Sequence, residues 1–309
     1  MRTSLLTVAL FLSSALTVGC YYDYSPFLRD AGWDAGIDGG SDGGLDAGHC
    51  DVLIPPVVDC QDYGGTLGWM CTVPAGCFMM GCNPDTDMEC QEPSEFPYHP
   101  VTFANAFRID KYEATVSQYK ACNTASPSTC TTPTTGYACN WGIIGRDDHP
   151  INCVNWIQAR AYCKWAGKRL PSEAEWEKAA RGTDGRKYPW GNTGLDCDHA
   201  VQNVTSCGYI GTAVVGSKPP GVSPYGLMDM IGNVWEQVED DWHDDYIGAP
   251  VDGSAWICTP ARCPYIVLRG GAWATSGSDS WRLRAAYRLF AYPSGIGSDT
   301  RGFRCAVTP

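Results

Sequence analysis

The sequence predicts a loop-rich α+β domain with short strands, two main helices and several disulfides. Aromatic and turn-forming residues are both abundant, since the 309 residues include 12 Trp, 16 Tyr, 35 Gly and 21 Pro. This composition is typical of short strands joined by tight turns rather than of long helical bundles. Two segments nevertheless carry complete helix signals, and the 17 cysteines indicate a cross-linked chain.

The N-terminal segment predicts an export signal. Arg2 precedes an apolar run from Leu5 to Leu16, and small residues then lead to Cys20. The run is shorter than the ~20 apolar residues of a membrane-spanning helix, which favours a signal peptide over residues 1–19. The cysteine that follows predicts lipid attachment at Cys20, although the leucine of a bacterial lipobox stands one position early. Simple secretion and an uncleaved anchor are the alternatives.

Residues 20–65 predict a flexible, acidic linker. Asp-Ala-Gly recurs at positions 30, 34 and 46 among further Gly, Asp and Ser. Such a segment buries too little apolar area to fold, so we expect a tether that holds a domain away from a membrane. Calcium binding by its aspartates is the alternative. The formal net charge of −12 argues against a nucleic-acid partner, which requires a basic face.

Globular composition begins near Cys60 and continues without a second linker, which predicts one domain over residues 66–309. The first helix is expected over 156–167. Asn155 can cap its N-terminus, apolar residues recur at helical spacing, and Gly167 can end it in the left-handed conformation.

The second helix is expected in LPSEAEWEKAARG, where Ser172 and Glu175 form a capping box and Gly182 ends the helix. FRIDKYEAT and YIVLRGGAW, at 107–115 and 265–273, predict short strands and loops between Gly, Pro and Asn turns.

Cysteine usage indicates an oxidising compartment. If Cys20 carries a lipid, 16 of the 17 cysteines remain, an even number that can pair completely. The spacings contain no CxxC pair, which favours disulfides over a tetrathiolate zinc site. Proximity in the chain predicts a bridge between Cys258 and Cys263.

Seven motifs follow one another in the order of a known family. They are VPAGCFMMG (73–81), FRIDKYEATVSQYKAC (107–122), HPINCVNWIQARAYCKWAGKRLPSEAEWEKAARG (149–182), YPWGN (188–192), YGLMDMIGNVWEQVEDDW (225–242), VLRGGAW (267–273) and GFRCA (302–306). This series resembles the formylglycine-generating enzyme family, also called the sulfatase-modifying factor family, over nearly all of 73–309. The resemblance implies that family's variant of the C-type-lectin-like fold.

The resemblance also implies a copper centre whose ligands are missing here. Enzymes of this family oxidise a substrate cysteine to formylglycine with O₂ and a copper(I) held by two cysteines. Alignment of Arg282-Leu283-Arg284 with the family's Arg-x-Arg-Cys pattern puts Ser280 and Ala285 at those positions. Because a hydroxyl and a methyl cannot replace soft thiolates, copper binding and this oxidation are expected to be absent. The five histidines are scattered, which disfavours an iron centre.

The residues around these positions are candidates for a ligand cleft. Arg282, Arg284 and Arg288 can face an acidic or peptide ligand, because guanidinium groups bind carboxylates and stack on rings. Trp235 and Trp273 are candidates for the same cleft. The alternative is structural, with the arginines paired to acids of the domain and the tryptophans in its core.

The segment DMIGNVWE implies one calcium site by the same resemblance. The carboxylates of Asp229 and Glu236 and the backbone oxygens of Gly232 and Val234 are the expected ligands, and oxygen donors suit this hard cation. The alternative is that Glu236 caps loop amides.

Two further disulfides follow from the resemblance. The family joins the cysteine of its AYC helix to that of GFRC, which implies a bridge between Cys163 and Cys305. A second calcium site of the family is expected to be absent, because Val201 and Cys207 stand at matching positions. A bridge from Cys207 to Cys197 is expected instead.

These observations predict an exported, lipid-anchored domain that has lost copper chemistry. It would act as a ligand- or protein-binding module at the cell envelope, with an envelope protein, a peptide or a glycan as partner, and would contact the membrane through its lipid only. The rival functions are a sulfatase-maturation oxidase, a non-haem iron enzyme with unidentified ligands, and a carbohydrate-binding lectin-like protein. The last rests on fold analogy alone.

Overall fold

The computed structural model describes residues 50, 56–90 and 92–308. The predicted signal peptide, Cys20 and most of the predicted linker lie outside the described residues. Within the described ranges, no helix combines the length and the apolar character that crossing a membrane requires.

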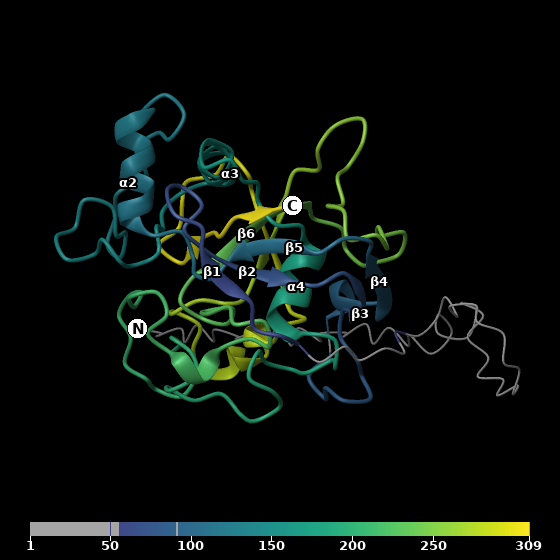
Figure 1. Ribbon diagram of the computed structural model, residues 1–309. Coiled ribbons are helices and arrows are strands. Elements are labelled where there is room, and N and C mark those ends of the chain that lie inside the picture. The colour runs from purple at the N-terminus through teal and green to yellow at the C-terminus, as the bar shows by residue number, and fades with distance from the viewer. Residues whose placement is uncertain (1–49, 51–55, 91, 309) are drawn as a thin grey trace, which may run out of the picture. The chain divides into compact units, whose positions relative to one another are not determined.

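A four-stranded sheet joins the first and last strands of the domain. Its order is β1 (Cys60–Asp62), β2 (Trp69–Val73), β5 (Phe107–Asp110) and β10 (Ala306–Val307), and all neighbours are antiparallel. The end of the chain therefore lies beside β5 (Figure 1). Because β1 pairs with β2 and Cys60 is bonded to Cys71, the fold begins upstream of residue 66, near Cys60, where the globular composition begins.

A second four-stranded sheet carries the segment that matches the copper site of the family. Its order is β8 (Arg288–Ala291), β7 (Ile266–Arg269), β6 (Trp235–Asp241) and β9 (Arg301–Gly302), with β6 and β9 parallel. The connection from β7 to β8 contains a 3₁₀ helix, η3 (Gly277–Leu283), and both Ser280 and Ala285. A separate hairpin pairs β3 (Gly76–Met80) with β4 (His99–Phe103).

Both predicted helices are present with the predicted N-caps, although the first ends at Trp165 rather than at the predicted residue 167. In α3 (Trp156–Trp165) the Asn155 side chain accepts from the N–H of Gln158, and Gly167 follows the helix with a φ of 73°. In α4 (Glu173–Arg181) the capping box is complete, and the C-cap is Gly182. Local signals thus determined both ends of these helices.

One further helix, α2 (Val116–Ala125), was not predicted. Thr115 and Gln118 form a capping box at its start, and the bridge between Cys122 and Cys130 holds its end. Its sequence VSQYKACNTA has little helical amphipathicity, because only a few of its side chains face the core. The Thr-x-x-Gln pattern was the available signal.

Helix α4 is buried along its whole length. It lies near the middle of the domain and packs against β3, β6 and β7, whereas α2 lies at the edge (Figure 1). All nine of its residues are buried, and five of these are charged: Glu173, Glu175, Glu177, Lys178 and Arg181. Since buried charges are costly unless they are paired, this helix requires partners from the surrounding strands and loops.

Eight disulfides use all 16 described cysteines. They include the three expected bridges, Cys163–Cys305, Cys197–Cys207 and Cys258–Cys263. No cysteine in the described part of the chain is left as a free thiol.

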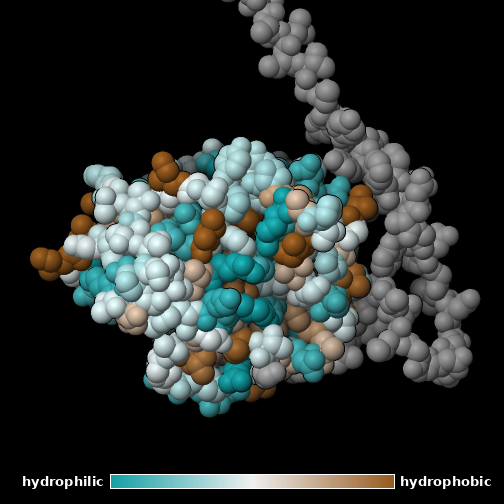
Figure 2. All heavy atoms as spheres, turned by 90° about the horizontal axis from the view of Figure 1, so that it is seen from above, coloured by the Kyte–Doolittle hydropathy of each residue, from teal (hydrophilic) through white to brown (hydrophobic). Residues whose placement is uncertain are grey.

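Exposed apolar side chains form small separate groups among hydrophilic ones on the face drawn in Figure 2. Singly exposed apolar residues are normal for a globular surface. The larger apolar residues pack into two internal clusters, one around Trp176 of α4 and one around Tyr162 of α3.

Candidate functional site

Positions 280 and 285 offer no sulfur ligand. Ser280 is half-buried in η3, whereas Ala285 is fully buried. The Ala285 N–H donates to the Lys187 carbonyl at 2.9 Å, and the Ala285 carbonyl accepts from Arg269 at 2.7 Å. The N–H and the carbonyl of Ala285 are therefore both hydrogen-bonded within the domain, and its methyl group faces the core.

Arg284 and Arg288 do not line a cleft, so the prediction that they face a ligand is wrong. Arg284 binds Glu95 through two hydrogen bonds of 2.6 and 2.7 Å, and also contacts Asp87. Arg288 binds both oxygens of Glu173 at 2.7 and 2.9 Å. Both guanidinium groups are buried and already paired, which is the structural alternative.

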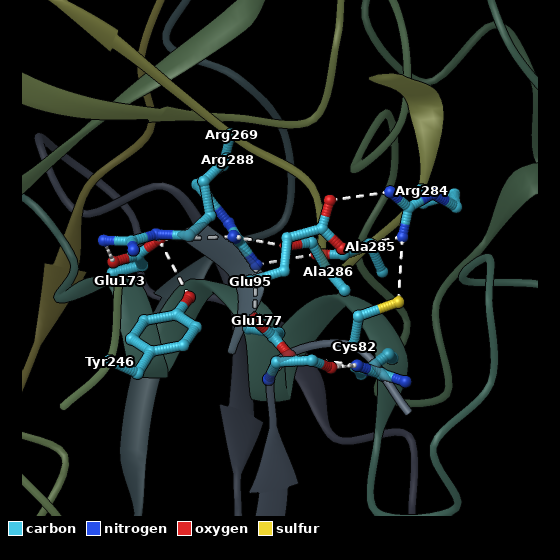
Figure 3. A network of polar contacts seen from close by, with 12 residues as sticks. Cys82, Glu95, Glu173, Glu177, Tyr246, Arg269, Arg284, Ala285, Ala286 and Arg288 are labelled. Atoms are coloured by element: carbon cyan, nitrogen blue, oxygen red, sulfur yellow. Dashed lines mark hydrogen bonds and ion pairs between the residues drawn. The ribbon is translucent and has the colours of Figure 1, made fainter. Parts of the chain in front are cut away.

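Arg269, which sequence reasoning missed, connects this loop to α4. It lies at the end of β7, is fully buried, and pairs with Glu177 and Glu173. The same guanidinium donates to the carbonyls of Ala285 and Ala286. Figure 3 shows Arg269, Arg284 and Arg288 converging on Glu95, Glu173 and Glu177. This network holds the 284–288 segment against the helix.

Two of the five predicted cleft residues do line a cavity together. Trp235 and Arg282 belong to the wall of a hollow of about 150 Å³, whose other lining residues are Ala272, Ala274, Thr275, Asp279 and Thr300. The Arg282 side chain is 38% exposed, and its nearest acid, Asp279, lies 3.7 Å away. Its Nε has no hydrogen-bond partner among the described residues, so the guanidinium has donors to spare.

Trp273 lies outside the lining of this cavity. Its indole N–H donates to the Asp299 carbonyl at 3.2 Å, and its backbone N–H donates to the Asn233 carbonyl at 2.9 Å. These bonds fix the ring outside this cavity, so the structure does not bring Trp273 together with Trp235 and Arg282 there.

The loop before β6 has an unusual backbone with several residues in the left-handed region. Asp229 and Asn233 both have a φ of 57°, and Gly232 has a φ of 85°. At Gly232 an added Cβ would lie 2.5 Å from the Val201 carbonyl oxygen, so only glycine fits. Asp and Asn tolerate this left-handed conformation better than other residues, and strained backbone of this kind often marks a functional site.

Glu236 is already neutralised. Arg304 binds its two oxygens at 2.6 and 2.7 Å, and the Trp176 indole donates to it at 2.8 Å. The Asp229 carboxylate accepts the N–H of Gly216 but forms no ion pair with a described lysine or arginine. Of the two predicted carboxylate ligands, Asp229 is therefore the one without a cation.

Glu113 adds a third buried acid that sequence reasoning missed. Its carboxylate accepts from the Asn233 side chain at 2.6 Å and from the Val234 N–H at 3.2 Å. Burial, reinforced by the negative charges of Asp229 and Glu236, raises the pKa of Glu113 well above its ordinary value. Burial also raises the pKa of Asp229 to about 6.

Of these three buried acids, only Glu236 is paired with a guanidinium, that of Arg304. Carboxylates and loop carbonyls are donors for a hard cation such as calcium, and Asp229 and Glu113 are the two of these acids that form no ion pair with a described lysine or arginine. A polar cavity of about 260 Å³ between the β1–β2 turn and the start of α2 also has Glu113 in its wall.

Residues 60–309 match the model of the sulfatase-modifying factor enzyme 1-like domain. The formylglycine-generating enzyme of Thermomonospora curvata is 39% identical over 183 residues, which cover 54% of this chain and 58% of the relative. A Bos taurus protein named inactive C-alpha-formylglycine-generating enzyme 2 is 38% identical over 175 residues, covering 53% of this chain and 52% of that one. The chain spans about half the length of these curated relatives.

Solved structures are similar over a larger share of the chain. PvdO from Pseudomonas aeruginosa is 33% identical with a TM-score of 0.69, and the match covers 82% of this chain and 99% of that one. Variable protein 1 of Treponema denticola is 25% identical with a TM-score of 0.56, covering 78% and 95%. The expected α+β fold, the C-type-lectin-like fold of the formylglycine-generating enzymes, is confirmed.

Proposed function

The chain belongs to the sulfatase-modifying factor family, and on that basis we propose that it is a ligand- or protein-binding member without copper-dependent cysteine oxidation. The absence of free cysteine thiols among the described residues supports this proposal. Serine and a buried alanine occupy positions 280 and 285, and all 16 described cysteines are bridged. Copper(I) requires soft ligands such as thiolates. The bovine relative named inactive is consistent with a family member that keeps the fold without the activity.

We place the domain at the cell envelope, exported and anchored by a lipid on Cys20. Its eight disulfides support this location, because disulfides persist in oxidising compartments. Its partner is an envelope protein, a peptide or a glycan rather than a nucleic acid, since the net charge of −12 would repel phosphates.

The cavity between Trp235 and Arg282 is the place where a ligand would bind. A guanidinium with free donors beside an indole suits a carboxylate attached to a flat or apolar group. At about 150 Å³ the cavity would admit one side chain or a small acid rather than a whole polymer.

Calcium at Asp229 and Glu113 is part of the same proposal. Burial raises the pKa of both carboxyl groups, so without a cation each holds its proton more tightly than an exposed acid, and neither forms an ion pair with a described lysine or arginine. A bound calcium would displace these protons, balance the two carboxylates and hold the loop of Gly232 in its left-handed conformation.

Copper uptake tests the proposed loss of oxidase activity. We expect the purified protein to take no copper(I) from a competing chelator and to leave a cysteine-containing sulfatase peptide unoxidised in O₂. The matched control is the double variant Ser280→Cys/Ala285→Cys, which restores both sulfur donors and is expected to take up copper(I). Stoichiometric uptake and formylglycine formation by the unchanged protein would identify it as a sulfatase-maturation oxidase instead.

Thermal unfolding with calcium or with a chelator tests the cation site. Calcium should stabilise the unchanged protein by about 2.7 kcal/mol at 100 times its dissociation constant. Glu113→Gln should remove most of that gain, yet leave the melting temperature in chelator nearly unchanged, because burial already favours the neutral form of Glu113 when no cation is bound and glutamine has the same shape. Glu239→Gln, a change at an acid that pairs with Arg160, should keep the calcium effect. An equal calcium shift in all three proteins would reject the assignment.

The same groups make stability depend on pH. Because the folded-state pKa of Asp229 is raised to about 6, the folded protein keeps a proton that the unfolded chain releases near pH ~4. In chelator, the contribution of Asp229 to stability should therefore fall as pH rises from ~4 to ~6. Calcium should cancel this fall in a denaturation series over that range.

A further inference from the structure

One disulfide has a ring nitrogen against its sulfur. Cys258 and Cys263 close the loop CTPARC, which lies between β6 and β7, and both cysteines are half-buried. Nε2 of His243 lies 3.5 Å from Sγ of Cys258. Among the described bridges, the half-buried Cys197–Cys207 has only Thr205 and Gln202 beside its sulfurs, and neither side chain can take up a proton.

The imidazole of His243 is held in one orientation. Its Nδ1 lies 3.1 Å from the Asp241 carbonyl oxygen, and since a carbonyl only accepts, this nitrogen donates its N–H. The lone pair of the neutral ring is then on Nε2, which faces the sulfur. The ring also stacks on Trp256, with centroids 3.6 Å apart and planes 2° from parallel.

The cysteine loop is fixed independently of its sulfur bond. Both cysteine N–H groups donate to the buried Asp241 carboxylate, at 2.9 Å from Cys258 and 3.4 Å from Cys263. Arg262 of the same loop binds the other oxygen of that carboxylate at 2.8 Å. These bonds would keep the two sulfurs and the imidazole together after the bridge opens.

We propose that Cys258–Cys263 is a thiol–disulfide exchange site in which His243 takes up the proton. The reductant is a thiol, either a small molecule or a cysteine of an envelope protein. Its sulfur bonds to Sγ of Cys263, the bridge breaks, and the electron pair leaves with Sγ of Cys258. The proton released by the attacking thiol is taken up by Nε2 of His243, so Cys258 leaves as a thiolate beside an imidazolium.

A second thiol completes the exchange. It attacks the external sulfur of the mixed disulfide, releases Cys263 and passes its proton to that cysteine. Two thiols are thereby oxidised to one external disulfide, and the bridge is reduced to the dithiol. This site goes beyond the proposed binding function and does not depend on it.

Reduction by glutathione tests the site, with another bridge of the same molecule as internal control. The native full-length chain is treated with reduced glutathione, quenched by alkylation, and each cysteine is followed by mass spectrometry. We expect Cys258–Cys263 to open at least about tenfold faster than Cys197–Cys207, and His243→Gln to abolish most of that advantage. Equal rates for both bridges, or a ratio unchanged by His243→Gln, would overturn the proposal.

Two single variants test the role of the imidazole without the bridge. Cys263→Ala leaves Cys258 beside His243, whereas Cys258→Ala leaves Cys263 without that neighbour. Both variants lose the same bridge, so any loss of stability is matched. We expect iodoacetamide to alkylate Cys258 about tenfold faster than Cys263, because only Cys258 has a base to favour its thiolate. Equal alkylation rates, or an advantage that persists when His243→Gln is added, would contradict the assigned role.

Discussion

Replacing Arg269 with methionine is expected to lower the free energy of unfolding by about 3–5 kcal/mol, measured by urea denaturation. The guanidinium is fully buried and pairs with Glu177 and Glu173. Its removal takes away one of the positive charges that pair with these two buried carboxylates. It also leaves the carbonyls of Ala285 and Ala286 without the donor they share. Methionine has a similar length, so packing changes little and the loss measures the polar network.

Two controls distinguish this network from a general effect of losing an arginine. Arg282→Met removes the same side chain from the neighbouring loop, but that residue is partly exposed and should cost less than about 1 kcal/mol. Adding Glu177→Gln to Arg269→Met should recover part of the loss, because the unpaired charge is then gone. A loss for Arg269→Met as small as that for Arg282→Met would show that the buried pairs contribute little.

Removal of the Cys163–Cys305 bridge should have an effect of similar size. The two cysteines are 142 residues apart, and a loop of that length restricts the unfolded chain by about 5 kcal/mol. The other bridges inside this loop are short and reduce the figure only slightly. We expect Cys163→Ala/Cys305→Ala to unfold at a clearly lower denaturant concentration than the unchanged protein.

The matched control is Cys197→Ala/Cys207→Ala, which opens a bridge between residues 10 apart. Its expected cost is about 3 kcal/mol, because a shorter loop restricts the unfolded chain less. If the two double variants lose equal stability, loop length does not determine the contribution of these bridges.

Local signals predicted α3 and α4 correctly: the Asn155 cap and the apolar periodicity for α3, and the Ser172–Glu175 capping box for α4, all lie within a few positions along the chain. A capping box at Thr115 was also present for α2, but only Val116, Tyr119 and Cys122 of its ten residues are buried, so its apolar periodicity is weak. Glu113 could not be recognised as a site residue, because its partner Asn233 is 120 positions away along the chain.

The sequence by itself determined the ends of the two main helices, the family, three disulfides and the missing sulfur donors at positions 280 and 285. Each of these depends on the identity of residues at known positions or at a fixed spacing. Only the tertiary structure decided which arginine of the 282–288 segment faces a cavity. Arg282, Arg284 and Arg288 have the same side chain, and they differ in the acids that distant segments bring to them, Glu95 to Arg284 and Glu173 to Arg288. A guanidinium that pairs with a buried carboxylate stabilises the fold and has few donors left. A guanidinium beside only a half-exposed acid keeps unpaired N–H donors.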